Sequence, residues 1–502
     1  MSDIVTLNGY KIKDEKAVRS YESIVQMKAD TKLKEGYHVK TKGYYEANDG
    51  GHGEYVIVDD DTLVDDGGLI HVLTNGLRAK LIIDDYITPE MFGAYGDGTH
   101  DDTTAIQHAF NSYKNVLLKG YYKCSSNIEI LNGHQLTITG TEIVQSGIKF
   151  VNGAYMSIGS STNVNELRMN KFAIVGDLSQ DVLLKINYVT NIYMTEVSLS
   201  ESNGYLMELN HGDIVFIDKC IFAGSNVLGT WWPCKGIKLT SANPIYITNC
   251  NIWNLTHFLD ILNGNTRTIT LLHNWIEFVN IIINCENQRL LNTNLVVNNN
   301  NIVWSPHGDN PDFSDGTIVN IDTSPDGFDV LISVKQNHII FYTDYPIDSL
   351  VKISELTGQT NVFIQDNIMF TRLQQVSKYA LNLDVKNNTR LYYSSTTNAD
   401  APYGCNIGGA IAQNISPNEN TMRLLNVSSA DTTLLPQTMT DGHIFYNAGG
   451  LYIKDLSALK RIPITVREEI ADIPTPATAT AEEVASKLNV LMAMLRRTNI
   501  IK

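Results

Sequence analysis

Short stretches in which polar and apolar residues alternate recur through the middle of the chain. In each stretch an apolar residue stands two positions after a polar residue. The polar residue is often Asn, and in one copy its place is taken by Cys250. Successive apolar positions lie 23 to 37 residues apart. Self-similarity at such a period indicates a solenoid. The nine apolar positions are Phe172, Val197, Ile221, Ile252, Ile276, Ile302, Ile339, Ile368 and Leu391.

The repeat predicts an all-β fold, a right-handed parallel β-helix of the pectate-lyase-like type. A rung of about 24 residues would form three short strands and three turns, and equivalent residues of successive rungs would stack about 4.8 Å apart. This stacking places the apolar column inside and lets Asn residues at the turns form hydrogen-bonded ladders. Leucine-rich repeats are the rival solenoid, but their Leu pattern is absent from the sequence.

The same pattern divides the chain into four expected parts. Residues 1–86 form a small N-terminal domain, and residues 87–395 form the β-helix. Residues 396–462 form a β-rich C-terminal domain, in which the alternation around Gly449 and Gly450 predicts a hairpin. The remaining segment, 463–502, is a linker followed by a short helix.

Apolar residues in the last segment are spaced alternately by three and four positions, as in a helical a/d seam. A single helix of this length is marginal alone. We therefore expect it to pack in a parallel bundle with copies of itself, with docking on its own chain as the alternative. The seam consists of Ala481, Val484, Leu488, Leu491 and Leu495.

Three aspartates crowd into the glycine-rich stretch "FGAYGDGTHDDTTAIQHAF", which begins at Phe92. The spacing of Asp97, Asp101 and Asp102 does not fit a calcium loop of the EF-hand type. The residues after Asp102 carry apolar side chains at helical spacing, so Asp101 or Asp102 is expected to act as the N-cap of a short helix. A metal-binding or catalytic role is the less favoured alternative.

Composition and charge exclude several classes of protein. The net charge of −16 argues against a nucleic-acid-binding protein and against adhesion to anionic membranes. The N-terminus lacks the apolar stretch of a secretion signal, and no run reaches 18 apolar residues, so neither a signal nor membrane insertion is expected. The six scattered cysteines form no CxxC pair and are expected to be reduced core thiols. We expect no metal and no cofactor.

Three segments resemble one known family. The stretch "ITPEMFGAYGDGTHDDTTAIQHAF" resembles the motif that leads into the pectate-lyase-like β-helix of bacteriophage tail spikes. Upstream, "VQMKADTKLKEGYHVKTKGYYEANDGGHGEYVI" resembles the small domain that precedes this motif, and "IADIPTPATATAEEVASKLNVLMAMLRRTNIIK" resembles a C-terminal segment of phage tail proteins. The order of the three is also that of the family.

This resemblance implies a homotrimer in the virion tail, assembled in the host cytoplasm and joined to other tail or baseplate proteins through its N-terminal domain. It further implies that the protein binds a host surface polysaccharide, which many tail spikes also cleave. It implies no catalysis by the motif around Asp102.

Two insertions suggest a cleft at one corner of the β-helix. When residues are counted from the apolar positions, the insertions "SNVLGTWWPCKG" and "SPHGDNPDFSDG" leave the helix at the same corner. Tryptophans stack on sugar rings, and carboxylates act as an acid/base pair in hydrolysis or as the base in elimination. The alternative for each acid is a solvated loop residue. The cleft would contain Trp231, Trp232, Asp260, Glu286, Asp309 and Asp312.

A second candidate site follows the positions next to the apolar column, which would face outward. An exposed apolar column usually marks an interface, so Glu277 within it is either a general acid or a structural partner of Lys or Arg from another subunit. Trp275, one position before the column, should face outward as well, whereas Trp304 should lie in the core. The outward column would be Phe222, Trp253, Glu277, Val303, Ile340 and Met369.

The sequence thus predicts a phage tail spike that recognises, and is expected to depolymerise, a bacterial surface polysaccharide by hydrolysis or elimination. The alternatives are a glycan-binding adhesin without enzymatic activity and a structural tail appendage. A free-living pectate lyase is disfavoured, because no secretion signal is seen and acids suited to calcium do not gather on one column.

Overall fold

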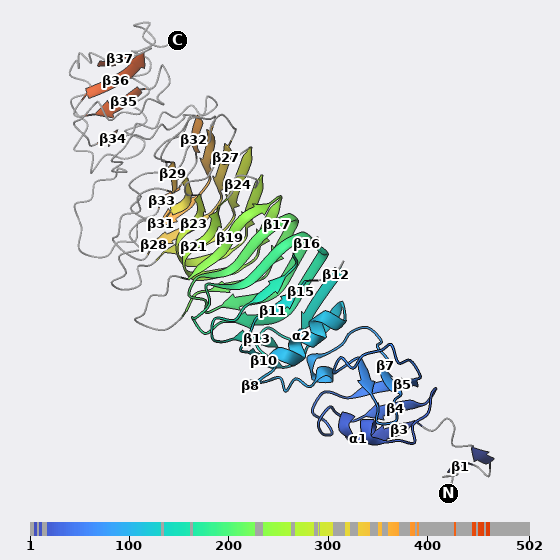
Figure 1. Ribbon diagram of the computed structural model, residues 1–502. Helices are drawn as coiled ribbons and strands as arrows, with labels where there is room; N and C mark the ends of the chain where they lie inside the picture. The colour runs from blue at the N-terminus through green and yellow to red at the C-terminus, as the bar shows by residue number, and fades with distance from the viewer. Residues whose placement is uncertain are drawn as a thin grey trace.

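The computed structural model describes most of the N-terminal two thirds of the chain and isolated strands beyond. The described residues are 5–7, 10–12, 18–131, 135–160, 164–225, 234–262, 267–285, 290, 292–304, 317–321, 330–341, 350–353, 360–370, 382–386, 389–390, 426–427, 444–447, 450–455 and 458–461. Figure 1 shows a stack of strands that runs from a small N-terminal domain toward the C-terminal end.

The N-terminal domain is one sheet with the strand order β3-β4-β5-β7-β6, with a short helix beside it. Met27 of the helix and Tyr55 and Ile57 of the central strand are fully buried and form its core. Its elements are β3 (Arg19–Tyr21), α1 (Ile24–Ala29), β4 (His38–Thr41), β5 (Gly53–Val58), β6 (Ile70–Val72) and β7 (Arg78–Leu81), preceded by the hairpin of β1 (Val5–Leu7) and β2 (Tyr10–Ile12).

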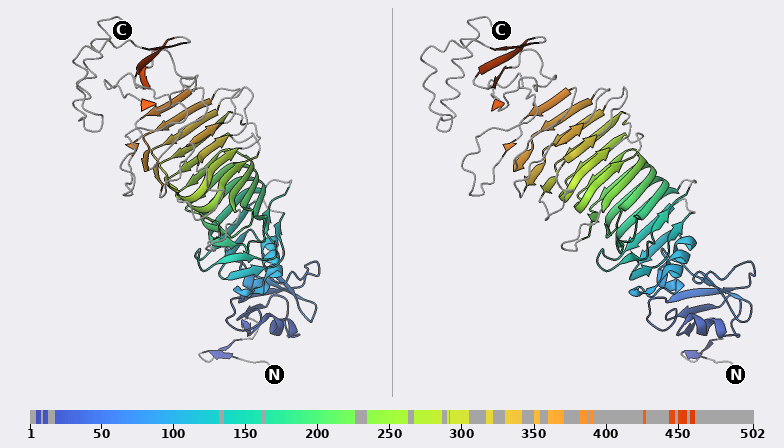
Figure 2. Two further views of the ribbon diagram at one scale, coloured as in Figure 1. Left: turned by 90° about the vertical axis from the view of Figure 1, so that its left-hand side faces the viewer. Right: turned by 60° about the vertical axis from the view of Figure 1, so that its left-hand side comes forward.

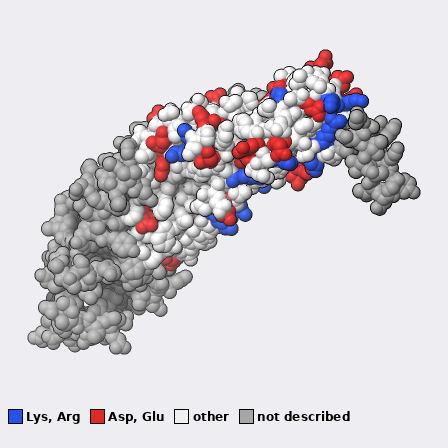
Figure 3. Space-filling model, turned by 90° about the horizontal axis from the view of Figure 1, so that it is seen from below, with Lys and Arg blue, Asp and Glu red and all other residues white. Residues whose placement is uncertain are grey.

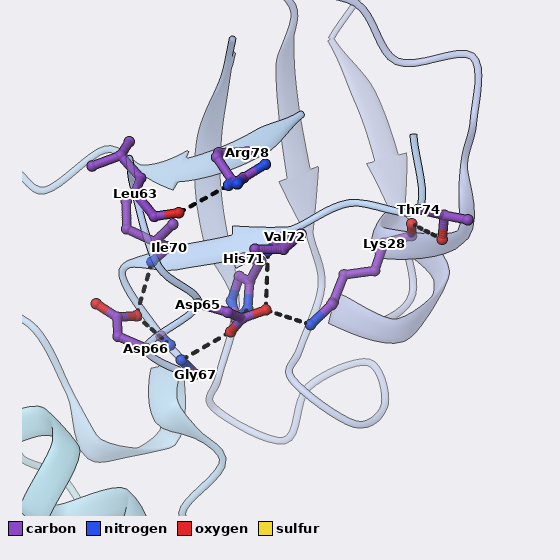
Figure 4. A network of polar contacts seen from close by, with 11 residues as sticks. Lys28, Leu63, Asp65, Asp66, Gly67, Ile70, His71, Val72, Thr74 and Arg78 are labelled. Atoms are coloured by element: carbon purple, nitrogen blue, oxygen red, sulfur yellow. Dashed lines mark hydrogen bonds and ion pairs between the residues drawn. The ribbon is translucent and has the colours of Figure 1, made fainter. Parts of the chain in front are cut away.

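A polar network fixes the loop before β6 (Figure 4). The Asp65 carboxylate accepts a bond from Lys28 Nζ at 2.7 Å and from the Val72 amide at 3.0 Å. His71 lies beside it, 3.8 Å from the Asp65 carboxylate. Burial lowers the pKa of His71 to about 4, so the ring is neutral at pH 7. The network therefore ties the helix α1 to the loop without placing a buried cation in the core.

The aspartate-rich stretch leads into the β-helix through η2 (Pro89–Phe92), β8 (Asp97–Asp101) and α2 (Thr103–Ser112). Asp102 is the N-cap residue by position, but its buried carboxylate accepts bonds from the amides of Tyr95 and Gly96 instead of capping α2. The predicted side-chain cap is therefore wrong for Asp102. Gly93 and Gly96, on either side of these amides, both have positive φ, a conformation that glycine adopts without strain, and the carboxylate is engaged by this turn. Asp101 instead bonds to the amide of Thr103, the first residue of α2.

The predicted parallel β-helix is confirmed, because every described strand from β8 to β33 pairs in parallel with its neighbours. Figure 2 shows from two further sides how the strands stack along one axis. Five strands bend around corners and contribute to more than one face: β15 (Val164–Val175), β16 (Val182–Ser200), β17 (Tyr205–Asp218), β21 (Asn251–Ile261) and β23 (Trp275–Cys285).

The pairings define three sheets, which we call sheets I, II and III. Besides segments of the bent strands, sheet I contains β9 (Asn115–Leu118), β12 (Gln135–Gly140), β20 (Ile245–Thr248), β22 (Thr268–Leu272), β24 (Thr293–Asn298), β27 (Val330–Lys335), β30 (Thr360–Gln365) and β32 (Asn382–Lys386). Sheet II contains β8, β10 (Tyr121–Cys124), β13 (Gly147–Phe150), β18 (Ile221–Ala223), β25 (Asn301–Trp304), β28 (His338–Phe341), β31 (Ile368–Phe370) and β33 (Thr389–Arg390). Sheet III contains β11 (Ile128–Ile130), β14 (Met156–Ile158), β19 (Lys235–Ala242), β26 (Thr317–Ile321) and β29 (Val351–Ile353).

The register of sheet II corrects part of the predicted apolar column. Ile221 and Ile368 were placed one residue too early, since Phe222 and Met369 pair in register with the rest of the column. Phe172 and Val197 lie two residues too early, in a neighbouring inward column. Leu391 lies outside the described residues. The inward column is Ile174, Leu199, Phe222, Ile252, Ile276, Ile302, Ile339 and Met369.

The predicted asparagine ladder is present at the corner between sheets I and II. The amide of Asn274 donates to the side-chain oxygen of Asn300 at 2.9 Å, and Asn300 bonds in the same way to Asn337, and Asn337 to Asn367. Each of these four side-chain NH₂ groups in turn donates to a backbone carbonyl, so the asparagines of the ladder are paired in their buried corner. Cys250 occupies the same column one rung earlier.

The remaining strands form a four-stranded sheet near the C-terminus. It contains β34 (Asn426–Val427), β35 (Ile444–Asn447), β36 (Gly450–Asp455) and β37 (Ala458–Arg461). Asn447 pairs with Gly450, so the predicted hairpin turns between these residues. The predicted helix of residues 480–495 lies outside the described residues. Five cysteines are buried free thiols, as expected, and Cys405 is not among the described residues.

Candidate functional site

One outward-facing column of sheet III is polar over its whole described length, and we call it the polar track. Each member stands between inward apolar residues, as Lys238 does between Ile237 and Leu239. With a rung spacing of about 4.8 Å the track extends for roughly 30 Å. Its members, aligned by strand register, are Glu129, Ser157, Lys185, Glu208, Lys238, Asp260, Asn284 and Asn320.

Asp260 forms the centre of the densest polar cluster on this track. One carboxylate oxygen accepts from His257 Nδ1 at 2.8 Å and from Asn284 Nδ2 at 2.9 Å. The other accepts from Tyr205 Oη at 2.6 Å, and Lys235 Nζ lies 3.4 Å from it. The residue is only 3% exposed. A carboxylate with this many donors serves to hold its partners in place.

The electrostatics of the cluster keep Asp260 ionised. Burial alone would raise the pKa of Asp260, but the hydrogen bonds from His257 and Tyr205 and the nearby charges of His257 and Lys235 outweigh it and lower the pKa to about 2. At neutral pH the group is therefore a fixed negative charge and cannot donate a proton.

His257 is held in one tautomer by this charge. An ionised carboxylate only accepts hydrogen bonds, so His257 Nδ1 carries the proton and Nε2 has a free lone pair when the ring is neutral. Nε2 bonds to none of the described residues, and the side chain is 17% exposed. An imidazole oriented by a carboxylate through one nitrogen and open at the other is arranged to act as a general base.

Two lysines and a second acid lie on the two rungs that precede Asp260. Lys235 and Lys238 both lie over the ring of Tyr205, at 5.3 Å and 6.0 Å from its centroid. Lys238 Nζ also donates to Glu208 at 3.1 Å. All of these side chains are partly exposed, and strands β17, β19 and β21 hold them on consecutive rungs.

A hollow of about 680 Å³ opens at the N-terminal end of the track. Amide, hydroxyl and carboxylate groups dominate its lining, and such groups make the hydrogen bonds that sugar hydroxyls need. Figure 3 shows, on the face drawn there, that acidic and basic side chains are interspersed rather than gathered by sign. The hollow is lined by Gln107, Asn111, Ser126, Asn127, Glu129 and Leu131.

The structure places only part of the predicted corner cleft. Asp260 is not a solvated loop residue, since it lies in β21 and is buried. The other predicted members, Trp231, Trp232, Glu286, Asp309 and Asp312, lie outside the described residues. Sequence reasoning therefore found the central carboxylate of the cluster but placed it in the wrong kind of environment.

Of the second predicted site, the outward column around Glu277, the structure retains a small patch on sheet II. Trp253 and Trp275 face outward as predicted, with 37% and 45% of their surfaces exposed, and Trp275 Nε1 donates to Glu277 at 3.0 Å. Phe222 was predicted to face outward and is instead fully buried in the inward column.

The register and burial of the other members also break the predicted exposed column. Met369 belongs to the inward column by register, and Val303 is only 2% exposed. Ile340 does share the register of Glu277 and Val303. The side chain of Trp304 lies outside the described residues. No continuous exposed apolar column therefore runs along the described part of sheet II.

Sequence reasoning missed Tyr205, His257, Lys235, Lys238 and Glu208. The signal that could have found the track is a polar residue enclosed by two apolar ones, repeated in successive rungs. It occurs in "MEL", "IKL", "LDI" and "VNI", of which the first begins at Met207. Without the register, such triplets cannot be told from ordinary strand alternation.

The described residues contain no group of three or more His, Cys, Asp or Glu side chains arranged to hold a metal ion. Within the same residues, neither helix has the length and apolar character that crossing a bilayer requires.

Comparison with known proteins locates one domain. Residues 20–84 match the family model of the phage tail protein small four-stranded beta-sheet domain. A capsule K30/K69-specific depolymerase of Klebsiella phage K64-1 is 32% identical over 122 residues, which cover 24% of this chain and 16% of that relative. The alignment thus spans less than a fifth of the relative's length.

Two solved structures of phage tailspikes match the chain at low sequence identity. The enzymatically active domain of tailspike protein 2 from bacteriophage CBA120 is 14% identical, with a TM-score of 0.45 over 76% of this chain and 54% of that one. The gp42 tailspike of Acinetobacter phage vb_AbaP_AS12 is 13% identical, with a TM-score of 0.42 over 87% of this chain and 86% of that one. A match to a phage tail protein domain at residues 20–84 is thus followed by a parallel β-helix, and the predicted resemblance to phage tail spikes is confirmed.

Proposed function

We propose that this chain is the receptor-binding tail spike of a bacteriophage and that it depolymerises a bacterial surface polysaccharide on the polar track. The observation that carries the enzymatic part is the cluster in which buried Asp260 orients the exposed side of His257. The capsule specificity of the Klebsiella phage relative supports a capsule or a similar glycan as the substrate class.

The wider assembly follows from the same proposal. Three copies form the spike, the domain at residues 20–84 joins it to other proteins of the tail or baseplate, and the particle is assembled in the host cytoplasm. The match to a phage tail protein domain supports the attachment role. The length and polarity of the track suit a linear polymer, because several sugar units can contact successive rungs at once.

The test is turnover of purified surface polysaccharides from a panel of bacterial hosts, read as loss of polymer mass and gain of reducing ends. His257→Gln should reduce turnover by ~100-fold or more, because it removes a general base. The matched control is His100→Gln. His100 forms the same i, i+3 pair with an aspartate, at 2.7 Å from Asp97, but lies on the surface near α2. Equal turnover by both variants would contradict the assignment of the site.

Binding without cleavage is a second candidate, favoured by the exposed tryptophans of sheet II. Trp253 and Trp275 present ring surface to solvent next to Glu277, as sugar-stacking sites do. If the parent protein retains a host glycan without shortening it, and Trp253→Ala together with Trp275→Ala abolishes retention, the protein is an adhesin. An inert appendage would bind no glycan of a host to which the phage adsorbs.

A further inference from the structure

We propose that the track cleaves an acidic polysaccharide by β-elimination, with His257 as the base that removes the proton next to a sugar carboxylate. This inference rests on the proposed function above. It deepens that function by naming the substrate class, a polymer that contains uronic acid units linked through O4, and the type of reaction.

The hydrogen bonding of Asp260 argues against hydrolysis on this part of the track. A glycosidase uses two carboxyl groups that reach the glycosidic oxygen and a water or the anomeric carbon. Both oxygens of Asp260 are already occupied, one by His257 and Asn284 and the other by Tyr205 with Lys235 nearby. Its role is therefore to position His257.

Glu208 does not supply the second carboxyl group that a glycosidase would need beside Asp260. It lies two rungs from Asp260, or about 10 Å along the axis, and is bonded to Lys238. Among the described residues of the cluster, this leaves one accessible carboxylate and one oriented imidazole. One base, without an acid partner of matching geometry, is what elimination requires.

The lysines beside His257 indicate an acidic sugar. Lys235 Nζ lies 3.4 Å from one oxygen of the Asp260 carboxylate, whose other oxygen accepts from His257. Lys185, Lys235 and Lys238 face two carboxylates on this stretch, one of which is saturated by its donors. This local excess of positive charge occurs in a chain of net charge −16, where the bulk field repels anions. A uronate carboxylate beside Lys235 would be neutralised, which makes the adjacent C5 proton easier to remove.

The step balances without a cofactor or co-reactant. His257 Nε2 takes the proton from C5, and the electron pair of that bond forms the C4–C5 double bond. The bond from C4 to O4 breaks, and O4 leaves with its electron pair. O4 takes a proton from the solvent and the imidazolium returns one to it, so no net water is consumed. The products are a new reducing end and a 4,5-unsaturated uronate.

The experiment compares uronate-containing capsular polysaccharides with the same polymers after their carboxyl groups are reduced to alcohols. The full-length protein should produce oligosaccharides that absorb in the ultraviolet and are lighter by one water than hydrolysis products. The carboxyl-reduced polymers should be cut at least ~100-fold more slowly, since the C5 proton is no longer activated.

Variants assign the step to its residues. His257→Gln should abolish the ultraviolet signal. In His257→Ala, imidazole added to the solution should partly restore this signal, and no such rescue is expected if His257 is only structural. Lys235→Gln should both raise KM for the acidic polymer and lower kcat, because Lys235 binds the uronate carboxylate and makes the C5 proton easier to remove. Thermal unfolding of each variant alongside His100→Gln shows whether the fold is retained, and the imidazole rescue applies only to folded protein.

The outcomes separate this inference from the proposed function. Saturated products of full mass, or equal cleavage of the carboxyl-reduced polymer, overturn elimination while depolymerisation stands. Release of acetate without loss of polymer length would make His257 the base of an ester hydrolysis and would also overturn it. If the protein shortens no polysaccharide of a host to which it binds, the proposed enzymatic function itself fails.

Discussion

Asp260 and Asp102 are both buried aspartates, yet the pKa of Asp260 is lowered and the pKa of Asp102 is raised. Burial raises the pKa of both. For Asp260, cationic and side-chain donors outweigh this effect, whereas Asp102 has two backbone amides as donors and other carboxylates in its surroundings, so its pKa stays raised. The pKa of a buried carboxylate in this fold thus depends on the side chains that the neighbouring strands place beside it.

The lowered pKa of Asp260 predicts an acid-dependent loss of stability. The folded pKa of about 2 lies below the unfolded value near 3.8, so the contribution is present above pH 4 and is lost as the pH falls toward 2. The difference corresponds to about 2 kcal/mol. Urea denaturation should show Asp260→Asn less stable than the parent at pH 6, with a gap that narrows between pH 4 and pH 3. Asp213→Asn, at an exposed position of β17, is the control and should show no gap.

Asp102→Asn should destabilise the protein by about 1–3 kcal/mol while leaving turnover unchanged. The two oxygens of Asp102 accept from the amides of Tyr95 and Gly96, and an amide side chain would point a donor at one of them. The unfolding midpoint of the variant measures this loss. A variant as stable as the parent would show that the glycine turn relaxes around the new donor, and loss of turnover in a folded variant would restore a catalytic role.

At the scale of elements, the asparagine ladder determines how one rung is attached to the next. In a solenoid each repeat contacts only its neighbours, so an interface lost at one rung is not compensated elsewhere. The ladder supplies one amide-to-side-chain bond per rung at a buried corner, where water cannot replace it. Single substitutions in the ladder are therefore expected to weaken the attachment of one rung to the next.

Asn300→Ala should cost about 2 kcal/mol or more, because it removes the acceptor of the buried Asn274 amide and a side-chain donor to the Leu271 carbonyl. Asn301→Ala is the matched control, since Asn301 is the next residue and is exposed. Its effect should stay within about 0.5 kcal/mol. Equal unfolding midpoints for the two variants in urea would show that the ladder contributes little.

At the scale of the whole molecule, we propose different roles for the small N-terminal sheet and for the β-helix. The domain matched to phage tail proteins contains the salt bridge between Lys28 and Asp65 and its own core, whereas the candidate chemistry lies on sheet III. The stack of strands places that chemistry away from the end that we propose to be attached to the tail (Figure 1).

The predicted trimer is testable by sedimentation. Full-length protein at micromolar concentration should sediment as three chains, because the predicted a/d seam of residues 480–495 would bury its apolar face in a parallel bundle of copies. A chain ending at residue 462 should dissociate, and Leu488→Ala should weaken the assembly. A full-length monomer at this concentration would contradict both the seam and the proposed assembly.

The sequence alone determined the β-helix, the hairpin at Gly450 and the N-terminal domain, because each leaves a local or periodic signal: a repeat, a turn between alternating strands, or a motif. The tertiary structure alone decided which residues meet. Phe222 faces inward, opposite to the prediction, because a rung of different length shifts the register by one residue. In a strand, a shift of one residue moves each side chain to the opposite face. Tyr205 and Asp260 are 55 residues apart and bond only because their strands stack with a single rung, that of β19, between them. The sequence pointed to Asp260, but the stacking decided that it is buried and holds His257.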